Sequence, residues 1–85
     1  MDKLTRELTE ILRETAMGGN IDKAGAEIAE AAGLDLRPEE AQKLNTILFD
    51  LEHARLRWNE IETRLPYYLN QVLEVLCLRD LVAVA

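Results

Sequence analysis

Few side chains in this sequence have the residue type and spacing that metal binding or catalysis requires. The single histidine, His53, follows Asp50 by three residues, which places a carboxylate and an imidazole on one face of a helix. In duplicate, with further glutamates, such a pair builds carboxylate-bridged metal sites in helical bundles. One copy supplies at most two ligands, so we expect no metal site and no cofactor.

Nucleophilic catalysis has no better candidate. Cys77 is the only cysteine and lies among Val75, Leu76 and Leu78, where cysteine usually acts as a small buried hydrophobic residue. The chain has no serine and no glycine-rich phosphate loop. We therefore expect a protein that is not an enzyme, and the lone cysteine favours a reducing, cytoplasmic location.

The composition is typical of one soluble domain over residues 1–85. Hydrophobic residues make up 48% and charged residues 31% of the 85 residues, too few residues for two cores. The net charge of −6 makes nucleic acid and anionic membrane unfavourable partners. No apolar run is long enough to cross a bilayer.

The sequence of the first third of the chain predicts a helical hairpin over residues 1–33, light in the sense that it has few large side chains. Leucines and isoleucines from Leu4 to Leu12 form one apolar stripe of a helix over residues 2–17. Gly18 and Gly19 should end that helix, and Asn20 should cap a second one that ends at Gly33.

Residues 38–65 carry the strongest pattern, an apolar seam with alternating spacings of three and four residues. Pro38 suits the first helical position, and we see no helix-breaking residue before Leu65, so the sequence predicts one long helix. The seam predicts a coiled-coil interface in a homo-oligomer, most simply a homodimer. Its residues are Leu44, Ile47, Leu51, Ala54, Trp58, Ile61 and Leu65.

Two charged residues that flank the seam, Arg55 and Glu62, suggest how two copies of the chain would pack together. In an antiparallel pair with its two-fold axis near Trp58, Arg55 of one chain would face Glu62 of the other. Alternatively, the segment after Pro66 folds back over the same seam and the dimer forms elsewhere. Residues 66–85 are apolar enough for a helix buried on several sides, and Pro66 either kinks one helix or separates two.

Four further hydrophobic side chains do not belong to the seam. Phe49 and Leu56 lie opposite it, and Tyr67 and Tyr68 follow Pro66. Either another helix of the same chain covers them, or they form a docking surface for a partner protein.

Residues 21–45 resemble a degenerate helix-turn-helix. Ala29, Gly33 and Leu34 have the spacing of its first helix and turn, which suggests a DNA-binding regulator. However, Glu39 and Glu40 stand where phosphates would approach.

Together these features predict an all-α oligomeric helical bundle. The function we expect is that of a small acidic protein–protein interaction module, such as an adaptor, chaperone or inhibitor. Its partners would be itself and another protein, and the DNA-binding regulator is the alternative.

Overall fold

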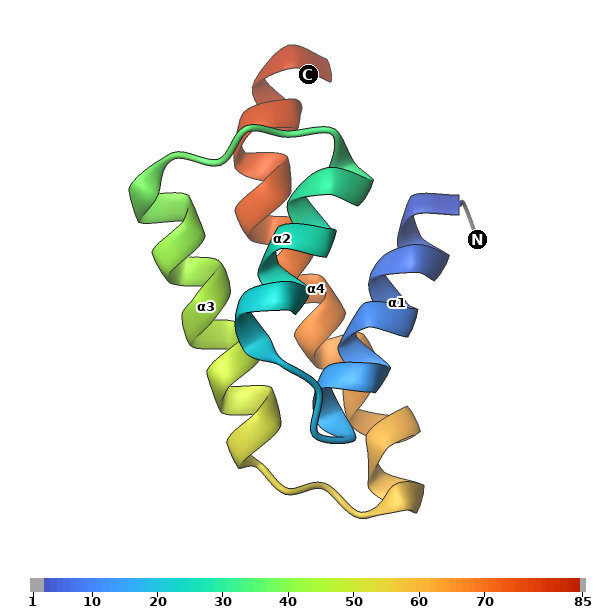
Figure 1. Ribbon diagram of the computed structural model, residues 1–85. Helices are drawn as coiled ribbons and strands as arrows, with labels where there is room; N and C mark the ends of the chain where they lie inside the picture. The colour runs from blue at the N-terminus through green and yellow to red at the C-terminus, as the bar shows by residue number, and fades with distance from the viewer. Residues whose placement is uncertain (1–2, 85) are drawn as a thin grey trace.

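The computed structural model describes the backbone of residues 3–84 and the side chains of residues 3–76. This part of the chain folds into a compact four-helix bundle, as the all-α prediction required. The helices are α1 (Lys3–Ala16), α2 (Ile21–Ala32), α3 (Pro38–His53) and α4 (Trp58–Val84). Consecutive helices run in opposite directions, so the α1–α2 and α3–α4 connections lie at the same end of the bundle (Figure 1). We call this the turn end.

The connection between α1 and α2 contains the two glycines that the sequence predicted as the end of the first helix. Gly18 adopts a positive φ of 101°, and a Cβ on Gly19 would lie only 2.9 Å from the carbonyl oxygen of Glu14. Both positions therefore favour glycine, and α1 ends there. The side chain of Asn20 accepts a hydrogen bond from the backbone N–H of Lys23 at 3.1 Å, which caps α2 as expected.

One continuous core holds the four helices together. The buried hydrophobic residues come from every helix, and they form a single contact cluster. They are Leu8, Leu12, Ala24, Ile28, Leu44, Ile47, Leu48, Leu51, Ile61, Leu65, Val72, Val75 and Leu76.

The prediction of one helix over residues 38–65 is wrong. The chain leaves the helical path after His53 and starts α4 at Trp58, so the two halves of the seam fold back against each other. Arg55 makes this possible because it adopts a left-handed conformation, with a φ of 49°. No glycine or proline marks the position, which is why the sequence pattern concealed it.

Local hydrogen bonds define both sides of the break. The ring nitrogen Nδ1 of His53 donates to the carbonyl of Phe49 at 3.0 Å, and the backbone N–H of Ala54 donates to the carbonyl of Asp50 at 2.9 Å, which closes the last turn of α3. On the other side, the carboxylate of Glu60 accepts the backbone N–H of Arg57 at 3.1 Å. This is half of a capping box, and Glu40 accepts the N–H of Arg37 in the same way at the start of α3.

Burial explains why the chain accepts this turn. A left-handed residue other than glycine costs about 1–2 kcal/mol. Folding back allows Leu51, Ile61 and Leu65 to be buried within the same core, and each such side chain contributes about 1.5–3 kcal/mol. The apolar surface removed from water therefore outweighs the backbone strain.

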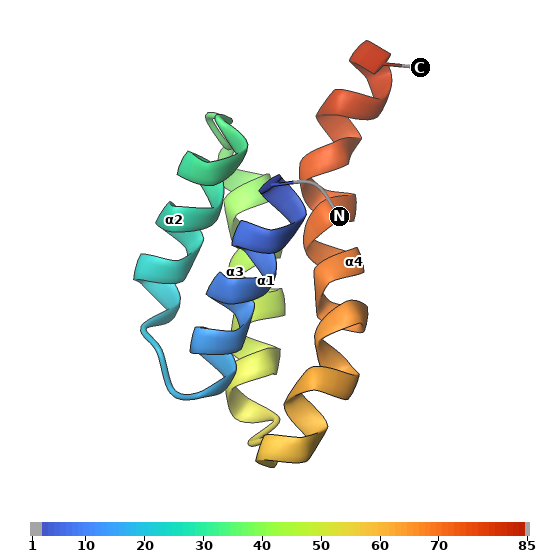
Figure 2. The same cartoon turned by 90° about the vertical axis from the view of Figure 1, so that its right-hand side faces the viewer.

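Pro66 does not separate two helices. It lies inside α4, which continues from Trp58 to Val84, so of the two alternatives left open by the sequence the chain takes the continuous one. At 1.5 Å per residue, 27 residues span about 40 Å, and α4 runs along the whole bundle (Figure 2). Val72, Val75 and Leu76 are buried, whereas Cys77 and the side chains after it lie outside the described residues.

We predict that Arg55→Gly leaves the fold intact and raises the free energy of unfolding by up to about 1 kcal/mol, because glycine removes the left-handed strain. Arg55→Val should lower it by about 1 kcal/mol or more, since a β-branched residue resists this conformation. Urea denaturation of both variants measures the difference. If glycine and valine at position 55 give equal stability, the left-handed turn is absent.

Candidate interaction surfaces

The predicted oligomer seam is used within one chain. Leu44, Ile47 and Leu51 of α3 pack in the same core as Ile61 and Leu65 of α4. Ala54, the C-cap of α3, and Trp58 are the two exposed residues of the seam, and Trp58 is 73% exposed. This differs from the intramolecular alternative considered from the sequence, because the chain reverses at residues 54–57, within the seam, and not after Pro66.

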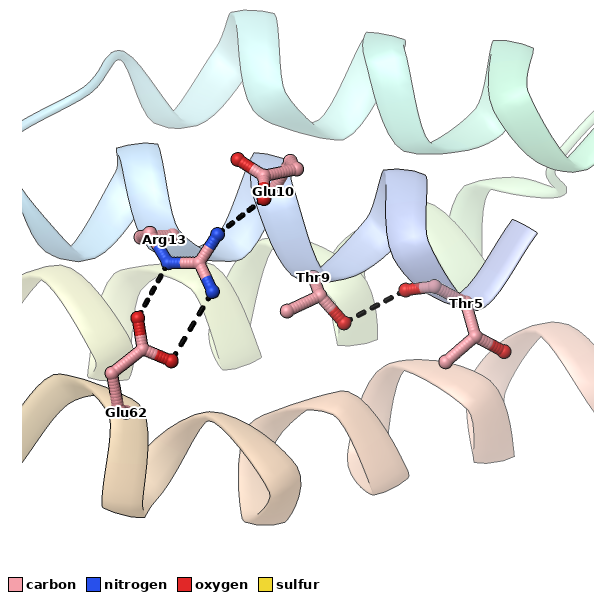
Figure 3. Close-up of polar contacts among 5 residues, drawn as sticks. All are labelled: Thr5, Thr9, Glu10, Arg13 and Glu62. Atoms are coloured by element: carbon pink, nitrogen blue, oxygen red, sulfur yellow. Dashed lines mark hydrogen bonds and ion pairs between the residues drawn. The ribbon is translucent and has the colours of Figure 1, made fainter. Parts of the chain in front are cut away.

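Glu62 is held by Arg13 of the same chain. The guanidinium donates two hydrogen bonds to the carboxylate, at 2.7 Å from Nε and 3.1 Å from Nη2, and it also contacts Glu10 (Figure 3). These bonds lower the pKa of Glu62 and raise that of Arg13. Within one chain Glu62 therefore has a bidentate partner, and Arg55 lies in the turn between the helices. The pairing of Glu62 with Arg55 of a second copy stays a prediction.

The Arg13–Glu62 ion pair also shows which residues of α1 and α4 lie at the same height along the bundle axis near the turn end. Helices α1 and α4 run antiparallel (Figure 1), and residues four apart lie on one helical face. Met17 follows Arg13 by four and still donates its N–H to the Arg13 carbonyl at 3.1 Å, while Trp58 precedes Glu62 by four. Met17 and Trp58 therefore lie on one face, one turn beyond the ion pair.

Both of these side chains face solvent. Met17 is 57% exposed and Trp58 is 73% exposed, although buried residues of both helices lie one or two turns away. An exposed tryptophan at the end of a bundle is unusual because the indole is among the largest apolar groups that folding can bury.

Of the four hydrophobic residues that the sequence placed outside the seam, two pack against the core and two are exposed. Leu56 and Tyr68 are half-buried against the core, as the same-chain interpretation required. Phe49 is 52% exposed and stacks on His53 with ring centroids 3.9 Å apart, and Tyr67 is 57% exposed beside Tyr68. Phe49 thus adds a third exposed hydrophobic side chain near the turn end.

An acidic groove that the sequence pattern did not predict lies between α1 and α2. The groove has a volume of about 520 Å³, and Ile11 and Ala31, both half-buried, contribute apolar surface to it. Five carboxylates line it, against one guanidinium, that of Arg6. They belong to Glu7, Glu10, Glu14, Glu27 and Glu30.

A signal for this groove was present in the sequence. Glu7, Glu10 and Glu14 share one face of α1 by their spacing, and Glu27 and Glu30 share one face of α2. Pattern alone could not show that the two faces adjoin, because that depends on how the hairpin packs. We call this feature the acidic groove.

Metal chemistry has no visible basis in the described part of the chain. Within it, no three His, Cys, Asp or Glu side chains come together in a way that could hold a metal ion. The imidazole of His53 is engaged with Phe49 through its stack and its Nδ1 hydrogen bond.

Over residues 3–84, no helix is both long and apolar enough to cross a membrane. Comparisons with protein-family models, with curated proteins and with solved structures found no match. The function of this chain is therefore inferred from its own geometry.

The Arg13–Glu62 pair predicts a specific pH dependence. Because the pKa of Glu62 is lower in the folded state than its usual value of 4.5, the pair stabilises the fold above that pH and loses its effect as the pH falls below it. We expect Glu62→Gln to be less stable than the natural protein at pH 7, with the difference shrinking as the pH falls from 7 through the usual glutamate pKa of 4.5 and below it.

Urea denaturation across this pH range measures the effect, and Glu74→Gln is the matched control because Glu74 is an exposed glutamate on the same helix. The control should show no comparable change with pH. A constant difference between Glu62→Gln and the natural protein at every pH would contradict the assigned pair.

Proposed function

We propose that the protein is a non-enzymatic protein–protein interaction module that works in the cytoplasm as a homo-oligomer, in the role of an adaptor, chaperone or inhibitor. The observation that carries this proposal is the exposed apolar surface at the turn end. Of the four large hydrophobic side chains that are exposed among the described residues, Met17, Phe49 and Trp58 lie near this end. Exposed tryptophan, phenylalanine and methionine are enriched at the cores of protein interfaces.

The chain's charge supports a protein partner over a nucleic acid. The net charge is −6, and five carboxylates line the acidic groove. A nucleic-acid surface would be repelled by that field, whereas a basic surface on a protein would be attracted.

The arrangement of α2 and α3 also disfavours the DNA-binding alternative. The two helices of a helix-turn-helix cross at about 90–120°, but α2 and α3 lie side by side in opposite directions (Figure 1). Arg37 precedes a first turn with Glu39 exposed, so a carboxylate would meet the phosphates. A sequence-selective complex with duplex DNA at low micromolar protein would nevertheless favour the regulator over our proposal.

Trp58 offers a direct test because it is the only tryptophan. We predict that its fluorescence emission moves to shorter wavelength as the protein concentration rises, since association would bury the indole. Trp58→Ala should weaken self-association by about 30-fold, which corresponds to the roughly 2 kcal/mol of a central interface residue.

Light scattering across a dilution series measures the association, and Tyr67→Ala is the matched control because Tyr67 is an exposed aromatic residue away from the turn end. A mass of 9.7 kDa at every concentration, together with a constant emission spectrum, would contradict a homo-oligomer.

A further inference from the structure

We infer that the copies join head to tail, with the α3–α4 turn of one copy docked in the acidic groove of the next. This inference rests on the proposed homo-oligomeric function and names the two surfaces that would meet. The observation behind it is that one chain carries two exposed features of opposite charge, each with an apolar centre.

The receiving surface is the acidic groove. Within residues 3–76, Glu14, Glu27 and Glu30 form no ion pair, while Glu10 contacts Arg13 and Glu7 lies 4.0 Å from Lys3. Carboxylates that line one groove repel one another, and an incoming cation relieves that repulsion. The apolar surface beneath them suits an aromatic or aliphatic side chain.

The inserting surface is the α3–α4 turn. Arg55, Arg57 and Trp58 are all exposed there, and neither arginine forms an ion pair with a described side chain. The carboxylates nearest in sequence belong to Glu52, three residues before Arg55, and Glu60, three residues after Arg57. Both are half-buried, and Glu60 accepts the backbone N–H of Arg57. Two exposed arginines therefore closely precede an exposed tryptophan in the chain, and both residue types are among those that dominate interface energies.

A second copy fits the groove better than the chain's own turn does. The groove lies on the face made by α1 and α2, whereas the turn joins α3 to α4 and lies at the end of the bundle (Figure 1). The contact we infer is heterologous, so it propagates into a ring or an open chain of copies. A reciprocal exchange of turn and groove about a two-fold axis would stop at a dimer, and a natural protein that never exceeds the dimer mass would overturn the head-to-tail arrangement.

The size and chemistry of the contact set its expected strength. One turn in one groove is at the small end of interface sizes, so we expect association that reverses on dilution. Because arginine and glutamate supply much of the recognition, added salt should weaken it.

The test uses two charge-reversal variants of the whole chain. The turn variant carries Arg55→Glu and Arg57→Glu, and the groove variant carries Glu27→Lys and Glu30→Lys. Matched controls reverse exposed charges elsewhere, with Lys43→Glu and Arg64→Glu for the turn and Glu74→Lys for the groove. Circular dichroism checks that each variant keeps its helices.

We expect each variant alone to associate at least about tenfold more weakly than the natural protein, while the controls associate normally. The decisive sample is an equimolar mixture of the two variants. The groove variant keeps an intact turn and the turn variant keeps an intact groove, so the mixture regains the natural contact, and its other contact again joins opposite charges. The mixture should therefore form mixed dimers or larger alternating assemblies at concentrations at which each variant alone stays dissociated, and sedimentation velocity measures their mass.

Other results separate this inference from the proposal on which it rests. If the natural protein self-associates but the variants associate equally well, or if their mixture forms no dimer or larger assembly, the head-to-tail contact is wrong and the homo-oligomer stands. If Met17→Ser disrupts assembly and the groove variant does not, copies meet through the Met17–Trp58 face. If the natural protein stays monomeric, both ideas fail.

Discussion

The left-handed turn at Arg55 is the constraint on which the rest of the structure depends. Without it, residues 38–65 would form one helix with an apolar seam about 40 Å long, and the two halves of that seam could not cover each other. With it, α4 returns along α3, and both halves of the seam enter one core. The same backbone reversal leaves Arg55, Arg57 and Trp58 exposed at the end of the bundle.

The turn and the Arg13–Glu62 pair act on the same part of the fold. The turn fixes where α4 begins, and the ion pair ties its first turns to the last turn of α1. An exposed ion pair contributes little to stability, so its main effect is geometric. It sets α1 and α4 in register and brings Met17 and Trp58 to the same level.

The sequence predicted the local features of the fold more reliably than their arrangement. The all-α class, the Gly18–Gly19 stop and the Asn20 cap follow from residue preferences that act within a few positions. The break at Arg55 does not, because arginine has no preference for a left-handed conformation. The free energy gained by burying the seam determines where the helix breaks. The periodic pattern of leucines cannot show this, because it is the same whether the seam is buried within one chain or between two chains.

The surfaces were predictable in part. Trp58 was identified as an interface residue, but as part of a seam that the structure uses internally. The acidic groove was missed because its two faces come from separate helices, and only their packing joins them. Glu60 gave the clearest overlooked signal, since an acidic residue three positions after Arg57 is typical of a helix start.

A distance between spin labels tests the folded-back arrangement most directly. Lys43 on α3 and Glu74 on α4 line one hollow between these helices, and both can be replaced by cysteine after Cys77→Ala. Pulsed electron resonance on labelled protein diluted with unlabelled protein then reports the distance within one chain. The turn at Arg55 predicts a separation far below the roughly 46 Å of one uninterrupted helix. A value near that length would show that the seam joins two chains and would contradict the folded-back arrangement.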